Sequence, residues 1–550
     1  MIEYVGKKKS GDILMGLLQL PRQQFRNLGS PKTWEFVTLA VTAVVTCLLF
    51  YLAIASRQDL DDLKAPVIGY NNPWEPNMFV RLRFIRRSRS ILREGYHQYK
   101  HYMFKVRRVG TDILVVSSQY MGELQHLTKD ATGSVPPLVK DYPGEWVHGT
   151  PFLRSTLQNL VLQQNLTPNL PAMIPTMVKE MNAAVESELG AQKDWTKVDI
   201  QPIIARIITR ITGQIFLGEV EGSNEEWLDA TIHYTENMFL TGWVLRFFPR
   251  FMCPLVVILL PSYYRLLRNV HSARRVIGRI VSERRAMEAQ GTPEYRKPAD
   301  VLQWMMNAAT GEQAEPNDLA QRMLLLSVTS IHTTTLTMTQ TIYDLCAHPE
   351  YFEPVRNEVV EALRRHRGWN KSTLTDMSKT DSLLKETQRF SPIFLLTWNR
   401  ITDRPVTLSN GLYLPAGTRV AVPSNEILQD PAKVPGIDPS VYDAFRYSRI
   451  REDQGHPGNA QKYLMAKTDL DNLAFGYGKF ACPGRFYAVN EMKMIFARML
   501  LCYEFKYPGG QGRPQNFTID SDLYPDPLTR LLIRKRDSIE DGIEELLETC

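Results

Sequence analysis

Near its C-terminal end the chain reads Phe475-Gly-Tyr-Gly-Lys-Phe-Ala-Cys-Pro-Gly484, and this stretch decides the fold. Its glycines let the backbone turn tightly around Cys482 and aim amide N–H groups at the sulfur. Pro483 and Gly484 are typical of the start of a helix, whose N-terminal end favours an anion. The stretch therefore predicts a sheltered cysteine thiolate followed by a helix.

Such a loop suits one kind of chemistry in particular. Haem iron held by a single cysteine sulfur needs a sheltered thiolate, and backbone N–H groups tune its electron donation. A chance match to Phe-x-x-Gly-x-x-x-Cys-x-Gly is expected on the order of once per thousand chains of this composition. The alternative is a glycine-rich loop with an inert buried cysteine.

The composition of the chain argues against several other classes of protein. The 550 residues are 44% apolar and 23% charged, with a net charge of +6, which is ordinary globular composition with material for a large core. No dense basic block with interleaved aromatic residues occurs, so no nucleic-acid partner is expected. The six cysteines form no Cys-x-x-Cys pair, which argues against a disulfide framework and a zinc site.

An uncharged stretch near the N-terminus, FVTLAVTAVVTCLLFYLAIA (36–55), contains no Pro or Gly. As a helix it would extend roughly 30 Å, the thickness of a bilayer core. We therefore expect a basic segment at 1–35, a transmembrane anchor helix at 36–56 and a catalytic domain at 57–550; the alternative for the anchor is a buried core helix. Basic residues lie on both sides of the span, so charge does not decide its orientation.

After the anchor the chain is predicted to be mainly α with a small β portion. The strand-rich part is 404–423, where β-forming residues flank an Asn410-Gly411 turn. A broken apolar stretch, Phe239–Leu260, suits either a membrane interface or a core helix–loop–helix. Helices are expected at Pro171–Leu189, Val198–Leu217, Tyr263–Gln290, Asn317–Cys346, Ser382–Phe390 and Gly484–Tyr503.

The cysteine stretch resembles the haem-binding signature of the cytochrome P450 family, and Cys-Pro-Gly-Arg-Phe486 is similar to its fungal members. The resemblance covers essentially everything after the anchor and implies the cytochrome P450 fold. It also implies a haem b cofactor, with Cys482 as axial ligand of the iron. The resemblance further implies that Phe475, Gly476 and Gly484 are cofactor-binding residues of the loop.

The resemblance implies a structural triad before the cysteine. Glu386 and Arg389 form a Glu-x-x-Arg pair on one helical face, and Arg446 would be the second arginine. Two earlier Glu-x-x-Arg pairs fit the motif equally well, but only this one is followed by Phe-Ser-Pro and then by the predicted hairpin. A carboxylate bonded to two guanidinium groups would lock the irregular segment beneath the haem.

Oxygen activation in the family uses an acid–alcohol pair on a long helix. Thr333 takes the alcohol position, where its hydroxyl can bond to a carbonyl one turn earlier and distort the helix. His332 replaces the acid and is either a proton shuttle or a structural residue. Phe480 stands where the family has a His or Arg that contacts a haem propionate, which leaves Arg400 as the cationic partner.

The activity implied is monooxygenation of a hydrophobic small molecule, such as a fungal terpenoid or polyketide intermediate. Electrons would come from NADPH through a separate NADPH–cytochrome P450 reductase, since the chain has no nucleotide-binding glycine loop. A cytosolic reductase implies a single-pass protein of the endoplasmic reticulum membrane with a cytosolic catalytic domain. The alternatives are a haem-thiolate enzyme that catalyses a rearrangement, and a non-enzymatic membrane protein.

Overall fold

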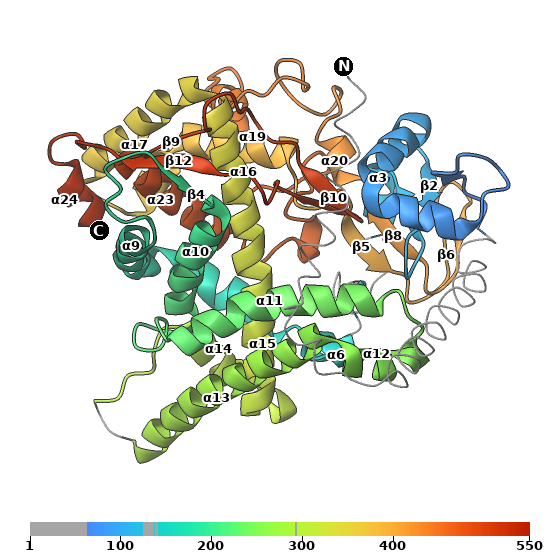
Figure 1. Ribbon diagram of the computed structural model, residues 1–550, viewed down its shortest axis with the longest axis horizontal. Coiled ribbons are helices and arrows are strands. Elements are labelled where there is room, and N and C mark those ends of the chain that lie inside the picture. Colours follow the sequence, from blue (N-terminus) through green and yellow to red (C-terminus); the bar gives the residue numbers. More distant parts are fainter. Residues whose placement is uncertain (1–62, 125–136, 138–140, 143, 292–293) are drawn as a thin grey trace, which may run out of the picture. The chain divides into compact units, whose positions relative to one another are not determined.

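The computed structural model describes residues 63–124, 137, 141–142, 144–291 and 294–550, which all belong to the unit formed by residues 57–550. They are mostly helical with a smaller sheet portion, as predicted. A long helical rod runs through the middle of the ribbon diagram (Figure 1). It consists of α15 (Pro316–Ser327), a π-helical segment (Val328–His332) and α16 (Thr333–Ala347). The predicted anchor lies outside the described residues.

Paired helices surround this rod. The helices α11 (Glu225–Leu245) and α13 (Pro261–Gln290) pack against each other and cross the rod near its π-helical segment and α15 (Figure 1). The other long helices are α3 (Asn77–Tyr99), α9 (Thr167–Leu189), α10 (Ile200–Leu217), α17 (Phe352–His366), α19 (Ser378–Phe390) and α23 (Arg485–Cys502). Shorter helices include α12 (Cys253–Leu259), α14 (Val301–Ala308), α18 (Lys371–Asp376), α20 (Ser424–Ile427), α21 (Arg446–Arg451), α22 (Asn459–Lys462) and α24 (Ile543–Glu548).

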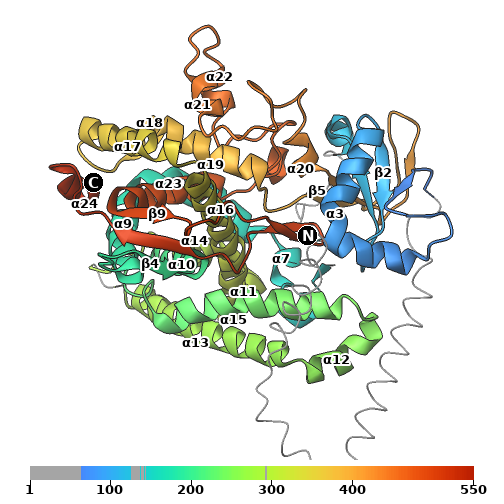
Figure 2. The same cartoon turned by 45° about the horizontal axis from the view of Figure 1, so that its top comes forward.

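The main sheet joins two distant parts of the sequence. Its strands run in the order β1 (Val67–Ile68), β2 (Met103–Val106), β3 (Ile113–Val116), β8 (Arg419–Val422) and β5 (Thr397–Ile401). In both ribbon views α3 lies over this sheet (Figure 2). The β3 and β8 strands are buried at every residue, which makes the sheet part of the core.

Smaller sheets complete the β portion. As predicted, Asn410-Gly411 joins two antiparallel strands, β6 (Val406–Thr407) and β7 (Tyr413–Leu414). The sequence had indicated a single strand-rich part, whereas the smaller sheets also include strands elsewhere in the described chain. These are β4 (Thr196–Val198), β9 (Tyr503–Lys506) and β12 (Leu531–Lys535) in one sheet, and β10 (Phe517–Ile519) and β11 (Asp522–Tyr524) in another.

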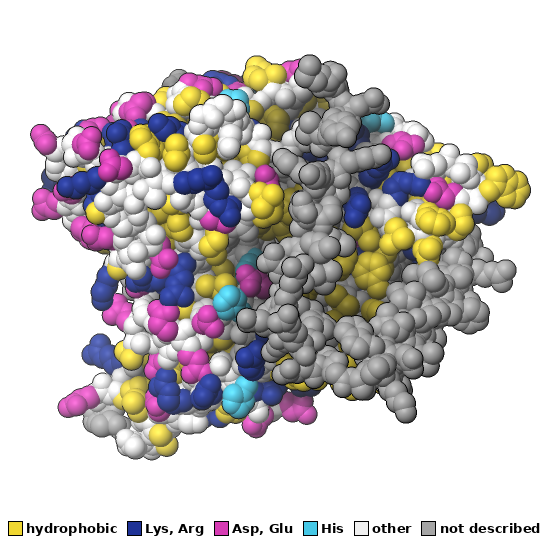
Figure 3. Space-filling view, in the orientation of Figure 1, with side chains coloured by type: hydrophobic (Ala, Val, Ile, Leu, Met, Phe, Trp, Pro, Cys, Tyr) yellow, Lys and Arg dark blue, Asp and Glu magenta, His cyan; other side chains and the backbone are white. Residues whose placement is uncertain are grey.

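The largest apolar cluster lies among α9, α10, α13, the α15–α16 rod, α17 and α23. A second cluster packs the main sheet against the chain that leads into the cysteine loop, through Trp398, Leu473 and Tyr477. On the face in Figure 3, the described basic and acidic side chains are interspersed. The core thus anchors both the central rod and the approach to Cys482.

The broken apolar stretch predicted at Phe239–Leu260 forms the end of α11, a short turn and α12. Several of its side chains are exposed, among them Phe251 at 78% and Leu259 at 75%. In the described chain no single helix has the length and apolar character to cross a bilayer. One bent pair, Arg250–Leu259 with Pro261–Gln290 at 84°, meets the length and composition criteria jointly.

Candidate active site

The loop around Cys482 is held by its own backbone. The Cys482 N–H donates to the Phe475 carbonyl at 2.7 Å, and the Gly476 N–H donates to the Leu473 carbonyl at 2.9 Å. Gly476 and Gly478 have φ angles of +76° and +65°, which L side chains rarely adopt, so glycine is needed at both. Gly484 has a φ of −90°, which any residue can adopt. The predicted tight turn around Cys482 therefore does not require a glycine at position 484.

The Cys482 sulfur lies at the start of α23, with Gly484 as N-cap. Burial raises the pKa of the Cys482 thiol, while the Gly484 and Arg485 N–H groups and the Arg485 charge lower it. The Arg485 side chain also donates to the Cys482 carbonyl at 2.8 Å. A thiolate here would therefore have amide donors and a nearby cation, which is the environment that an iron-binding sulfur requires.

The central rod changes its hydrogen-bonding pattern just before Thr333. Residues Val328–His332 form a π-helical turn, and the Thr333 hydroxyl donates to the Thr329 carbonyl at 2.7 Å. A threonine bond of this kind bends a helix, and π turns recur at functional sites. Leu324 to Val328 are buried, but Thr329 is exposed and Thr333 is half-buried, so one stripe of the turn is not covered by protein.

His332 reaches the neighbouring helix α11. Its ring hydrogen-bonds the Ile232 backbone and lies in the field of Glu236. Burial lowers the pKa of His332, and its Nε2 atom is buried without a hydrogen-bond partner in the described part of the chain. The imidazole is therefore neutral near pH 7 and links the π turn to α11.

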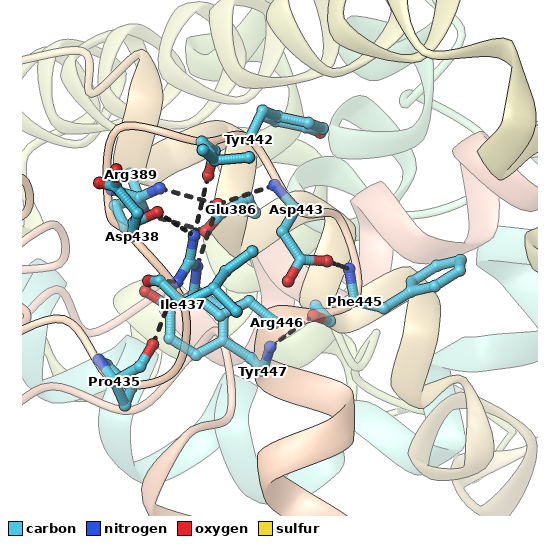
Figure 4. A network of polar contacts seen from close by, with 12 residues as sticks. Glu386, Arg389, Pro435, Ile437, Asp438, Tyr442, Asp443, Phe445, Arg446 and Tyr447 are labelled. Carbon is cyan, nitrogen blue, oxygen red and sulfur yellow. Dashed lines mark hydrogen bonds and ion pairs between the residues drawn. The ribbon is translucent and has the colours of Figure 1, made fainter.

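Glu386, Arg389 and Arg446 come together in a buried cluster (Figure 4). The Arg389 guanidinium donates to both Glu386 carboxylate oxygens at 2.8 Å, and Arg446 Nε donates to one of them at 3.2 Å. The remaining Arg446 nitrogens donate to backbone carbonyls at Pro435, Ile437, Asp438 and Val441. One buried carboxylate thus ties α19 to the irregular segment 435–446.

Arg400 lies on β5 between two aromatic rings. Its guanidinium carbon is 4.8 Å from the Trp398 ring centre and 4.7 Å from the Phe480 ring centre. Nη1 donates to the Asn399 carbonyl, but Nε is buried without an acceptor among the described residues. Burial lowers the pKa of Arg400 to about 10. A buried cation with no described carboxylate partner fits a ligand that carries its own carboxylate, as the haem propionates do.

One residue that sequence reasoning passed over belongs to this region. Trp398 forms one wall of the Arg400 site, and its only sequence signal is its place two residues before Arg400 on the same strand face. The neighbouring stretch Ile393–Leu396 is divided: Phe394 is exposed, whereas Leu395 and Leu396 are buried in the cluster beside the sheet.

The comparisons with known proteins agree with this geometry. The family model for "Cytochrome P450" matches residues 91–530. The chain is 49% identical over 477 residues to "Ent-kaurene oxidase P450-4" from Gibberella fujikuroi, covering 86% of this chain and 93% of that protein. It is 46% identical over 474 residues to "Cytochrome P450 monooxygenase AN1598" from Emericella nidulans (86% and 88% covered), and 41% identical over 501 residues to "Cytochrome P450 monooxygenase olcJ" from Penicillium canescens (91% and 93% covered).

A mainly helical fold with a glycine-turned cysteine loop and a distorted central helix defines a haem-thiolate class of protein. The chain belongs to the cytochrome P450 family. It is accordingly an oxidoreductase of the monooxygenase class, and the family implies a haem cofactor and an electron supply from a reductase.

Proposed function

We propose that the protein hydroxylates, or oxidises in a similar way, a polycyclic terpene hydrocarbon, using electrons that NADPH supplies through a separate cytochrome P450 reductase. The observation that carries the chemistry is the Cys482 loop, in which backbone amides and the Arg485 charge act on a half-buried cysteine sulfur. The terpenoid class is supported by the 49% identity to proteins named ent-kaurene oxidase.

In this proposal Cys482 holds the haem iron and Arg400 binds a propionate. The Phe475 carbonyl and Gly476 shape the loop, and the Gly484 N–H donates toward the sulfur. When bound, the haem supplies the oxygen chemistry: one atom of O₂ enters the substrate and the other leaves as water. Glu386, Arg389 and Arg446 have a structural role, because all three are buried and bonded to each other or to backbone.

Thr333 is the residue that we propose holds and passes a proton. Its hydroxyl donates to the Thr329 carbonyl, and its oxygen has lone pairs with which it can accept a hydrogen bond from a water on the uncovered stripe. For His332 the contacts favour the positioning role over the proton shuttle. A neutral ring bonded to α11 keeps the π turn open for Thr333 to act.

We also propose that the protein is bound to the endoplasmic reticulum membrane with its catalytic domain in the cytosol. The expected anchor at 36–56 is one contact with lipid. A second is α12, where Leu255, Ile258 and Leu259 share one exposed face. Apolar side chains at this spacing suit insertion below the headgroups, where a hydrophobic substrate is also dissolved.

The test is a reconstitution of the full chain with a cytochrome P450 reductase, NADPH and ent-kaurene in lipid vesicles. A red-shifted Soret band of the reduced, carbon-monoxide-bound protein should appear in the wild type and vanish in Cys482→Ser. Under ¹⁸O₂ we expect labelled oxygen in a product whose formation requires NADPH. A product formed without NADPH or without label would instead favour the rearrangement reaction, and a preparation that takes up no haem would refute the proposal.

A further inference from the structure

Phe480 is a departure from the family pattern at a position that normally carries charge. It stands two residues before Cys482, in a 3₁₀ turn (Gly478–Phe480) of the cysteine loop. A phenyl ring has no hydrogen-bond donor, so it cannot bind a propionate as a His or Arg would. The ring instead contacts a cation from a distant part of the sequence: the Arg400 guanidinium carbon lies 4.7 Å from the Phe480 ring centre.

The second ring that contacts this cation is the Trp398 indole, which the backbone of β5 holds in an unusual conformation. The register of β5 against β8 shifts between Thr397 and Arg400, which marks a β-bulge. Trp398 has a φ of +51°, an angle that bulky residues seldom adopt. Its indole packs among Leu473 and Tyr477, at the start of the cysteine loop. The bulge therefore fixes the indole and Arg400 relative to the loop that carries Phe480.

Two aromatic contacts constrain how the guanidinium lies. A planar guanidinium stacks its face on a ring and donates hydrogen bonds in its own plane. Nη1 already donates to the Asn399 carbonyl, which leaves the other N–H groups for an acceptor outside the described residues. A guanidinium held this way can meet a carboxylate with two parallel N–H donors.

We propose that Phe480 is a positioning residue for haem binding: with Trp398 it holds the Arg400 guanidinium in the plane from which it donates to a haem propionate. Orientation of one cation thus replaces the second cation that the family places two residues before the cysteine. This inference rests on the proposed haem site and assigns a role to a residue that would otherwise count as a lost ligand.

Lys479 provides a matched control on the same ring. Its ammonium lies 4.9 Å from the Phe480 ring centre, but its side chain is exposed, so water and salt screen the contact. If any cation near Phe480 could support haem binding, removing Lys479 would speed haem loss as much as replacing the Phe480 ring. We expect it not to matter, because only Arg400 is buried.

The experiment measures haem loss from the full-length holoprotein in detergent, with excess apomyoglobin as the haem acceptor. Phe480→Leu should lose haem about tenfold faster than wild type, and Phe480→Met serves as a second variant without a ring. Phe480→Tyr and Lys479→Ala should stay within about twofold of wild type. Phe480→His should also retain haem, because an imidazole can donate to the propionate directly.

A double-mutant cycle separates positioning from general packing. In an Arg400→Lys background the planar guanidinium is gone, so Phe480→Leu should change the rate less than about threefold. A tenfold effect in that background would overturn the inference, as would a Leu variant that retains haem like wild type or a Tyr variant that loses it like Leu. A wild type that binds no haem would instead refute the proposed function.

Discussion

Glu491 is a carboxylate in the core of the protein, and its replacement by Gln should change how stability depends on pH. One carboxylate oxygen accepts hydrogen bonds from the Tyr487 hydroxyl at 2.8 Å and the Thr212 hydroxyl at 3.2 Å. The other oxygen is buried with no partner among the described residues. Burial raises the pKa of Glu491 from 4.5 to about 8, so the carboxyl is protonated in the folded protein near pH 7.

The sign of the effect follows from proton linkage. Between pH 4.5 and 8 the unfolded chain releases the Glu491 proton while the folded chain keeps it, so stability falls as pH rises. Each pH unit in this window removes about 1.4 kcal/mol, and from pH 4.5 to 7 the loss reaches about 3 kcal/mol. Glu491→Gln is neutral at every pH and abolishes this loss.

The assay compares thermal unfolding of both holoproteins by circular dichroism at pH 4.5 and pH 7, with the same scan rate. For a chain of this size 1 kcal/mol corresponds to about 1 °C, so the Gln variant should gain about 3 °C relative to wild type between the two pH values. Glu186→Gln, which removes an exposed carboxylate from α9, should shift by less than about 0.5 °C. A difference between Glu491→Gln and wild type that is the same at both pH values would refute the reasoning.

Three further substitutions test other parts of the protein. Glu386→Ala leaves two buried guanidinium groups without their carboxylate and should cost about 3–5 kcal/mol in unfolding free energy, whereas Glu361→Ala, on the exposed side of α17, should change it by less than about 0.5 kcal/mol. Thr333→Val keeps the side-chain shape but loses the hydroxyl, so product formed per NADPH should fall about tenfold with the haem spectrum unchanged. The same amount of product per NADPH in the variant and the wild type would contradict the role of Thr333. Burial beside Asp520 raises the pKa of Asp522 to about 7, so Asp522→Asn should become more stabilising as pH rises from 4 to 7. A change in melting temperature that is the same at pH 4 and pH 7 would argue against a raised pKa at Asp522.

The cysteine loop and the hairpin were predictable because their determinants are local. Gly476 and Gly478 are needed for positive φ angles within a few residues of Cys482, and Asn410-Gly411 forms its turn without help from elsewhere. The long helices were predictable for the same reason, since apolar periodicity and caps are read within one segment.

The features that sequence reasoning missed depend on pairs far apart in the chain. The main sheet pairs β3 with β8, strands separated by about three hundred residues, and no local pattern predicts that register. The left-handed backbone at Trp398 arises from the bulge against β8 and cannot be inferred from a tryptophan in a strand. Glu491 on α23 would pass for a surface residue of a helix, yet it is buried and accepts a hydrogen bond from Thr212 of α10.

The two departures from the family pattern have a common physical form. At Phe480 a neutral ring stands in place of a cation, and at His332 a half-buried, neutral imidazole stands in place of an acid. In each case the residue contacts a neighbour that it can orient. Phe480 contacts Arg400, and His332 bonds to α11 and so holds the π turn that precedes Thr333. Haem binding and proton handling should therefore depend more on how Arg400 and Thr333 are held than on added charge. Substitutions that disturb orientation, such as Phe480→Leu, should then have larger effects than substitutions that remove a nearby exposed charge, such as Lys479→Ala.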